Sequence, residues 1–243
     1  MTRGRLAFAG AGVALIALLG IGAAYAYFFS GLRSAPPPLA LATPTPGASS
    51  SATPAAAGEL AGTWKVASGS QAEWRVSEVF VGTTSPHNAV GRTSGVSGGL
   101  TVQPGASGLE ASGLNFTADL TQLASVDTVA GRDVSQRDQL VRQSLSTRTF
   151  PTATFQSSQP VAIPAGLAAG QQVQVSVAGQ LTIHGVTKDV TATVMVQMSG
   201  AQVQAAGTIP TDMGTFNITP PFAPFVTIDK TVTIGFLLNL SRS

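Results

Sequence analysis

Apolar and polar residues alternate with a period of two through most of the chain after residue 60. The stretches 114–120, 190–196 and 232–238 each place apolar side chains at every second position, and shorter alternating runs surround Trp64 and Val175. Successive side chains of a β-strand point to opposite faces, so this pattern predicts antiparallel strands with one apolar and one polar face. Gly, Pro, Ser and Asp are frequent between the runs, as in turns.

One segment breaks the alternation. Residues 133–143 have helical spacing, which predicts a short helix that ends before Pro151. Its apolar residues share one broad face: Val134, Leu140, Val141 and Leu145. We therefore expect an all-β fold of about eight or nine strands with one inserted helix, built as a closed barrel or as a sandwich. A closed barrel leaves no exposed strand edges, and eight strands are just enough to enclose one small ligand.

The 24 residues 6–29 carry no charge and would span about 36 Å as a helix, against about 30 Å of bilayer hydrocarbon. Arg3 and Arg5 precede this segment and Arg33 follows it, so the positive-inside rule places the N-terminus in the cytoplasm. We expect a single-pass cell-membrane protein with an extracytoplasmic domain. The alternative is a signal peptide cleaved near Ala26, which would leave the domain secreted or periplasmic.

A linker follows the apolar segment. Residues 35–58 are uncharged and include six prolines, a composition that favours extended polyproline conformation and builds no core. We divide the chain into an N-terminal anchor or signal peptide (1–33), a disordered linker that holds the domain off the membrane (34–59), and a β-barrel domain (60–243).

Composition excludes several functions. The chain has 13 Lys and Arg and 11 Asp and Glu, but three of the arginines precede the domain, which leaves the domain near neutral. We therefore expect no nucleic-acid partner. There is no cysteine, which excludes disulfides, thiol catalysis and Cys-ligated zinc. The two histidines are isolated in the sequence, so we expect no metal site.

One motif has the form of a hydrolase site. Gly95-Val96-Ser97-Gly98-Gly99 matches the G-x-S-x-G pattern, and acidic residues and His184 follow it along the chain. The nucleophile elbow needs a strand, a sharp turn and a helix, whereas residues 100–102 look like strand. We expect no catalytic residues, and a lipid esterase is kept as an alternative.

Three short segments, taken in order, carry a family resemblance. The chain reads RDQLVR from Arg137 and FPTATF from Phe150, then GQLTIHGVTK over 179–188, and later PTDMG over 210–214. These segments resemble motifs of the YceI-like family of extracytoplasmic polyisoprenoid-binding proteins, and the resemblance covers about residues 60–243. The chain departs from the family pattern in its second and third strands and has Met213 where an aromatic residue is common.

The resemblance implies an extended, lipocalin-like antiparallel barrel around a long isoprenoid tail, such as that of a quinone or prenyl lipid. It implies binding rather than catalysis, with no cofactor other than the bound lipid. The residues that we expect to line the cavity include two phenylalanines of a rigid apolar lip at 219–225. The set is Trp74, Phe116, Phe155, Val175, Val194, Phe216, Phe222, Phe225 and Phe236. The same residues could equally fill a solid core.

Polar candidates for a lipid headgroup are Arg137, Arg142 and His184. Four arginines between residues 132 and 148 could bind a pyrophosphate or another anionic headgroup, or could form a solvated helix face. Arg137 and Asp138 could form a structural ion pair. His184 could instead belong to a hairpin turn, and His87 is given no role.

We therefore expect a membrane-tethered extracytoplasmic protein that binds or carries a long-chain apolar lipid. The alternative is a protein-interaction module that uses its outer surface or loops and holds no lipid. A filled core or a large exposed apolar patch would favour that alternative. The oligomeric state stays open, and a homodimer is compatible with the sequence.

Overall fold

The computed structural model describes residues 33–42, 60–81, 86–106, 108–129, 133–221 and 224–243. The apolar segment 6–29 lies outside these residues, so the predicted membrane helix stays a prediction. Within the described part of the chain, no helix combines the length and the apolar character needed to cross a bilayer.

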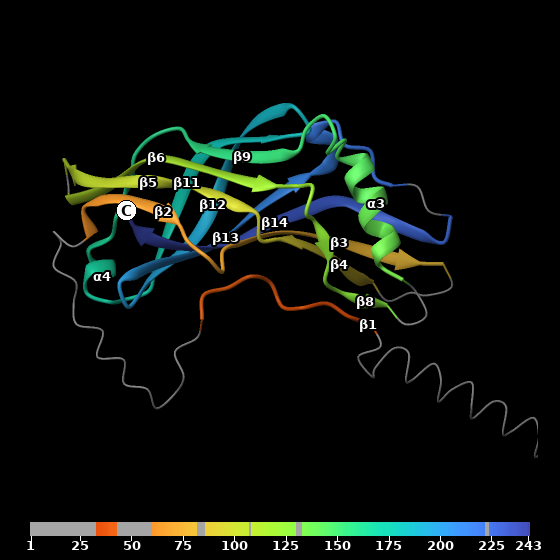
Figure 1. Cartoon of the computed structure of the whole chain (residues 1–243), viewed down its shortest axis with the longest axis horizontal. Coiled ribbons are helices and arrows are strands. Elements are labelled where there is room, and N and C mark those ends of the chain that lie inside the picture. The colour runs from red at the N-terminus through yellow and green to blue at the C-terminus, as the bar shows by residue number, and fades with distance from the viewer. Residues whose placement is uncertain (1–32, 43–59, 82–85, 107, 130–132, 222–223) are drawn as a thin grey trace, which may run out of the picture.

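Eight antiparallel strands close into a barrel (Figure 1). In their order around the barrel, they are β14 (Val226–Arg242), β2 (Gly62–Val66), β5 (Val96–Gly105), β6 (Gly108–Asp119), β9 (Thr152–Ser157), β11 (Val173–Ile183), β12 (Val186–Ser199) and β13 (Gln202–Asp212). Pairing of β13 with β14 closes the ring, with Ile209 opposite Ile234. The predicted all-β class and the barrel of about eight strands are confirmed.

The long strand β14 also carries an extension of the sheet. Beyond its pairing with β2, it pairs with β3 (Gln71–Phe80), and the sheet continues through β4 (His87–Thr93) to β7 (Ala124–Ser125). A short strand, β10 (Val161–Ala162), pairs with β6, and a 3-10 turn, η1 (Met213–Phe216), follows β13. The extension widens one end of the barrel.

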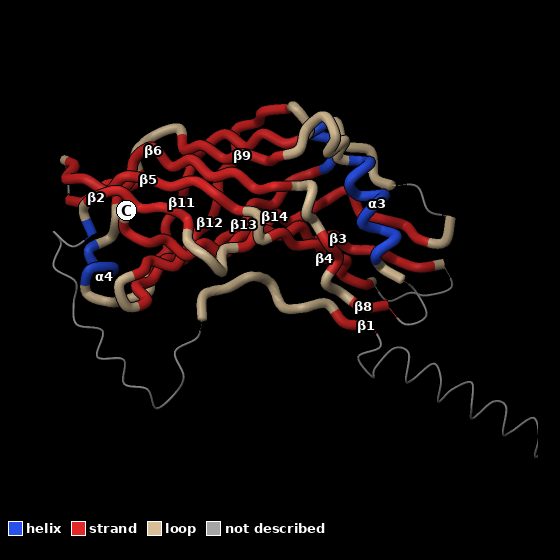
Figure 2. The backbone as a smooth tube through the Cα atoms, viewed as in Figure 1, coloured by secondary structure: helices blue, strands red, loops and turns tan. Residues whose placement is uncertain are grey.

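Two helices lie at opposite ends of the barrel (Figures 1 and 2). The helix predicted over 133–143 is α3 (Ser135–Ser144), and the shorter α4 (Ala165–Ala168) lies at the far end. Between them the inward face of the strands is apolar, as the alternation predicts. Buried side chains from most of the barrel strands form one core, among them Trp64, Val102, Leu114, Val177, Val194 and Leu238.

The first part of the predicted linker is bound to the barrel rather than free. Residues 33–42, here called the strap, run along its outside (Figure 1). β1 (Arg33–Ser34) pairs with β8 (Thr128–Val129). The carbonyls of Pro36 and Pro37 accept hydrogen bonds from the guanidinium groups of Arg75 and Arg92, at 2.9 and 2.7 Å. An extended proline-rich segment has no internal hydrogen bonds, so its carbonyls are available to outside donors. This part of the linker is therefore a docked segment, and residues 43–59 lie outside the described chain.

Candidate functional site

The barrel encloses two cavities with mainly apolar walls. Cavity 1 has a volume of about 450 Å³ and is lined by residues of α3, β3 and β14. Cavity 2 has a volume of about 190 Å³ and reaches Leu167 of α4. The interior is therefore hollow. The residue types alone do not distinguish a hollow interior from a filled one, because cavity walls and solid cores use the same types.

The two cavities share part of their walls. Ala72, Ala118, Ala153, Leu181 and Ile234 line both of them. Ala118 of β6 lies opposite Ala153 of β9, and neither methyl group extends far into the interior. We call these five residues the waist. Because the cavities adjoin at the waist and extend toward opposite ends of the barrel, their arrangement suits a chain-like ligand better than a compact one.

Most of the apolar residues predicted to line a cavity do so. Trp74 and Phe225 line cavity 1, and the residues that line cavity 2 are Phe116, Phe155, Val175, Val194 and Phe236. Phe216 lines neither cavity, because it is buried in the surrounding core. Phe222 lies outside the described residues.

Helix α3 forms part of the wall of cavity 1. The apolar face that the sequence predicts for this helix turns toward the interior, since Val134, Leu140, Val141 and Leu145 all line the cavity. The helix thus covers the widened end of the barrel, where β3 and β4 extend the sheet.

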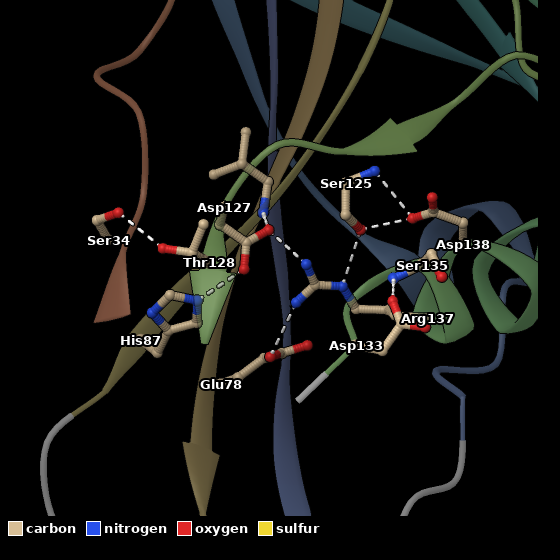
Figure 3. A network of polar contacts seen from close by, with 11 residues as sticks. Ser34, Glu78, His87, Ser125, Asp127, Thr128, Asp133, Ser135, Arg137 and Asp138 are labelled. Atoms are coloured by element: carbon tan, nitrogen blue, oxygen red, sulfur yellow. Dashed lines mark hydrogen bonds and ion pairs between the residues drawn. The ribbon is translucent and has the colours of Figure 1, made fainter. Parts of the chain in front are cut away.

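A group of buried and half-buried polar residues adjoins cavity 1 (Figure 3). Arg137 of α3 donates from Nη1 to Glu78 at 3.3 Å, from Nη2 to Asp127, and from Nε to the Ser125 hydroxyl at 3.1 Å. Its guanidinium also lies 5.9 Å from the centre of the Trp74 ring. Glu78 and Arg137 line the cavity, so these two residues bring polar groups to its wall.

Further hydrogen bonds complete this polar cluster, defined as Glu78, His87, Ser125, Asp127, Arg137 and Asp138. Asp127 is fully buried and accepts from His87 Nε2 at 2.8 Å and from the Val90 amide at 3.0 Å. Asp138 accepts from the amide and the hydroxyl of Ser125, at 2.8 and 2.6 Å. Arg137 and Asp138 therefore do not form the expected ion pair with each other. Both side chains bind Ser125, and Arg137 pairs with Glu78 and Asp127.

The two acidic residues of the cluster that pair with Arg137 have shifted pKa values of opposite sign. Burial raises the pKa of Glu78, and the charge of Arg137 opposes this shift only in part. Burial also acts to raise the pKa of Asp127. Hydrogen bonds from His87 and Val90 and the charge of Arg137 outweigh burial, so the pKa of Asp127 is lowered. Asp127 is the firmly ionised acid, and Glu78 is the acid nearer to its neutral form.

Of the six cluster residues, only Arg137 was a predicted site residue, and Asp138 was expected only as its ion-pair partner. Among the other four, only Glu78 has a clear sequence signal. Glu78 follows Trp74 and Val76 at the same period of two, which places a charged side chain on the inward face of β3. His87 is buried at the start of β4, although the sequence gives it no role. Asp127 lies between two short strands, in a segment without periodicity.

The other two headgroup candidates line neither cavity. Arg142 donates to the Leu123 carbonyl at 2.9 Å. His184 and Gly185 have φ values of 53° and 72° and form the two-residue turn between β11 and β12, as expected for a type I′ hairpin. The imidazole contacts the Phe216 carbonyl and a serine hydroxyl, each at 3.2 Å. The structure thus favours the turn over a headgroup contact.

The described residues give no support to the hydrolase motif or to a metal site. Ser97 lies within β5, paired with Thr117 of β6, so the strand continues where a nucleophile elbow would turn into a helix. In the same part of the chain, no three His, Asp or Glu side chains are grouped so that they could hold a metal ion.

Comparisons with known proteins agree with this architecture. No curated protein matches the chain. A polyisoprenoid-binding domain from Saccharophagus degradans, implicated in plant cell wall breakdown, has the same fold with 19% identity and a TM-score of 0.53, over 75% of this chain and 99% of that one. BcnA of Burkholderia cenocepacia is 25% identical with a TM-score of 0.45, over 68% and 95% of the two chains. The model of the YceI-like domain matches residues 64–240, from β2 to β14. Because this match covers most of the chain, the protein belongs to the YceI-like family.

Proposed function

We propose that this protein binds a long-chain apolar lipid inside its barrel and holds it outside the cytoplasmic membrane, to which the N-terminal segment tethers it. The observation that carries the proposal is the pair of apolar cavities that adjoin at the waist inside the barrel. Removing each CH₂ group of a ligand from water contributes about 0.8 kcal/mol, so a long tail supplies most of the affinity.

Membership of the YceI-like family and the named ligand class of the Saccharophagus degradans domain support a prenyl chain as the tail. The walls suit such a chain, because they combine aromatic and branched side chains and offer few polar groups. Apolar cavities hold little ordered water, so a prenyl tail would displace few hydrogen-bonded molecules on entry.

The charges around cavity 1 support an uncharged headgroup. Among the described residues that line this cavity, Arg137 is the one basic side chain, whereas Glu73, Glu78 and Asp133 are acidic. Arg137 already pairs with Glu78 and Asp127. Glu73 is likewise paired, with Arg75 and Arg92. A pyrophosphate would therefore find no unpaired basic side chain among the described lining residues, and burying its charge without one is costly. A carbonyl or hydroxyl, as in a quinone or a prenyl alcohol, would need only one hydrogen bond.

Tryptophan fluorescence of the full chain provides the test. The chain has two tryptophans, and Trp74 lines cavity 1 while Trp64 lines cavity 2. We expect a long-chain prenyl quinone to quench the fluorescence at about one molecule per chain, and a prenyl pyrophosphate of equal length to bind far more weakly. Mass spectrometry of an organic extract would then identify the natural lipid.

The protein-interaction alternative makes the opposite prediction. Without a bound lipid, the extract would contain no stoichiometric prenyl compound, and added quinone would leave the fluorescence unchanged. The variant Trp74→Phe is the control for position, because it removes the reporter of cavity 1 and leaves that of cavity 2. Loss of quenching in this variant would place the quinone ring beside cavity 1, whereas quenching that persists would place the ring within reach of Trp64 in cavity 2.

A further inference from the structure

Exposed apolar side chains gather at one end of the barrel. Among the described residues, four large apolar side chains are strongly exposed: Val81 at 73%, Phe225 at 43%, Val126 at 41% and Leu140 at 40%. We call these four residues the rim. The Val81 amide donates to the Phe225 carbonyl at 2.9 Å, and Val126 lies two residues before β8. Leu140 and Phe225 also line cavity 1, so the cavity wall reaches the surface at the rim.

The strap begins at this same end of the molecule (Figure 1). Its first two residues form β1, which pairs with β8, and the hydroxyls of Ser34 and Thr128 are 2.9 Å apart. From there the strap runs along the outside of the barrel, past Glu73 to Gln197, whose amide donates to the Ala42 carbonyl at 3.3 Å. The polypeptide that precedes Arg33 therefore joins the barrel beside the rim.

The short chain segment between residues 29 and 33 limits how far the strap can lie from the uncharged stretch 6–29. The uncharged stretch 6–29 ends four residues before Arg33. Four extended residues span at most about 14 Å. If the stretch 6–29 lies in the bilayer, Arg33 lies within that distance of the lipid headgroups, and the rim lies at the end of the barrel where Arg33 joins it. An apolar surface held so close to a membrane is the arrangement expected of a membrane-docking site.

We propose that the rim docks on the outer surface of the bilayer, so that lipid passes between the membrane and cavity 1 without crossing water. The tether through residues 6–29 and the identity of the lipid rest on the proposed function, whereas the docking of the rim does not depend on what the barrel holds. Transfer of a long apolar tail through solution is unfavourable because it exposes the tail to water. A rim docked on the bilayer removes that barrier, because the tail stays in apolar surroundings.

Site-directed spin labels test the docking directly. The chain has no cysteine, so Val81→Cys and Val126→Cys each introduce one labelling site, and neither residue lines a cavity. Gln172→Cys is the matched control, because Gln172 is exposed and lies between α4 and β11 in the sequence. The labelled full chain is reconstituted into vesicles of phosphatidylcholine and phosphatidylglycerol. Accessibility to oxygen, which concentrates in bilayers, is compared with accessibility to a water-soluble nickel chelate.

We expect a several-fold higher oxygen-to-nickel ratio at residues 81 and 126 than at residue 172. Equal ratios at the three positions would overturn the docking. Doping the vesicles with a prenyl quinone separates the two proposals, because tryptophan quenching reports occupancy of the barrel. If tryptophan is quenched while all three labels remain in water, the docking proposal alone is contradicted. If the labels at residues 81 and 126 lie in the bilayer but tryptophan is not quenched, the lipid-binding proposal alone is contradicted.

Uptake kinetics provide a second measurement. The double variant Val81→Glu, Val126→Glu places two charges on the rim outside the cavity walls. We expect quinone uptake from vesicles to slow several-fold, with the final extent of quenching unchanged. Gln172→Glu should keep the wild-type rate. An unchanged rate in the double variant would contradict direct passage through the rim.

Discussion

A single guanidinium group holds two buried carboxylates beside cavity 1. Arg137 of α3 bonds to Glu78 of β3 and to Asp127, which connects the helix to the widened end of the barrel. Loss of one partner from a buried ion pair is costly, because the remaining charge stays away from water. We expect Arg137→Met to lower the free energy of unfolding by about 3–5 kcal/mol, measured by urea denaturation.

Arg148→Gln is the control for the Arg137 variant. Arg148 follows the same helix but is exposed, so its replacement should change the free energy of unfolding by no more than about 0.5 kcal/mol. Equal effects of the two substitutions would show that the polar cluster contributes little to stability.

Glu78 should make stability depend on pH. Burial raises its pKa above the ordinary value of 4.5, so the folded protein binds this proton more tightly than the unfolded chain does. The contribution of Glu78 is therefore most favourable below pH 4.5 and declines as the pH rises through the folded-state pKa. We expect wild type to lose stability relative to Glu78→Gln over this interval, in urea titrations at a series of pH values. A relative gain by wild type would mean that the Arg137 ion pair outweighs burial.

The polar cluster shows how far single residues can be predicted. Glu78 could have been assigned to the interior, because it shares the period of Trp74 and Val76 on an alternating strand. Asp127 and His87 could not, since they come from short, irregular segments and meet only when the chain folds. Arg137 was a candidate from its motif, but its partners lie 59 and 10 residues away in sequence.

At the scale of elements, the strap is a docked segment that composition does not reveal. Strands and α3 could be predicted because packing against a core imposes a period on their side chains. The strap binds mainly through its backbone carbonyls, which every residue has, and its only buried side chain among the described residues is that of Leu41. A proline-rich sequence without charge is therefore equally compatible with a free spacer and with a bound one.

Leu41 should keep the strap in place. Burial of a leucine contributes about 1.5–3 kcal/mol, so Leu41→Asp should favour release of the strap by a factor of about ten or more. We expect trypsin to cleave the full chain after Arg33 faster by that factor, as followed by the mass of the product that begins at Ser34. Ala40→Asp adds the same charge at an exposed position and should leave the rate unchanged. Equal cleavage of the two variants would mean that Leu41 does not hold the strap.

The whole molecule combines a closed ring of strands with a hollow interior. The closed all-β fold followed from alternation and from the family motifs, but the hollow interior could not, because cavity walls and solid cores use the same residue types. The waist illustrates the reason. Ala118 and Ala153 are ordinary strand alanines in the sequence, and only their pairing across β6 and β9 places two small side chains at the junction of the cavities.

The waist should set the length of tail that the barrel accepts. Ala153→Phe introduces a ring between the two cavities, which would confine a ligand to cavity 1. Loss of two to four buried CH₂ groups costs about 1.6–3 kcal/mol, so long-chain prenyl quinones should bind more weakly by a factor of about ten or more. A short-chain quinone that fits in cavity 1 alone should keep its affinity. Tryptophan quenching measures both ligands with the same protein.

Thr152→Phe is the matched control, because it places the same ring on the exposed face of β9. Thermal unfolding of both variants would establish that the barrel remains folded, and the control should bind both quinones as wild type does. If Ala153→Phe weakened the binding of the two quinones equally, the phenylalanine ring would affect cavity 1 or the whole barrel rather than passage through the waist. If it weakened neither, the tail would lie within cavity 1, and cavity 2 would not take part in binding. A selective loss of the long-chain ligand would establish that the tail passes between the cavities.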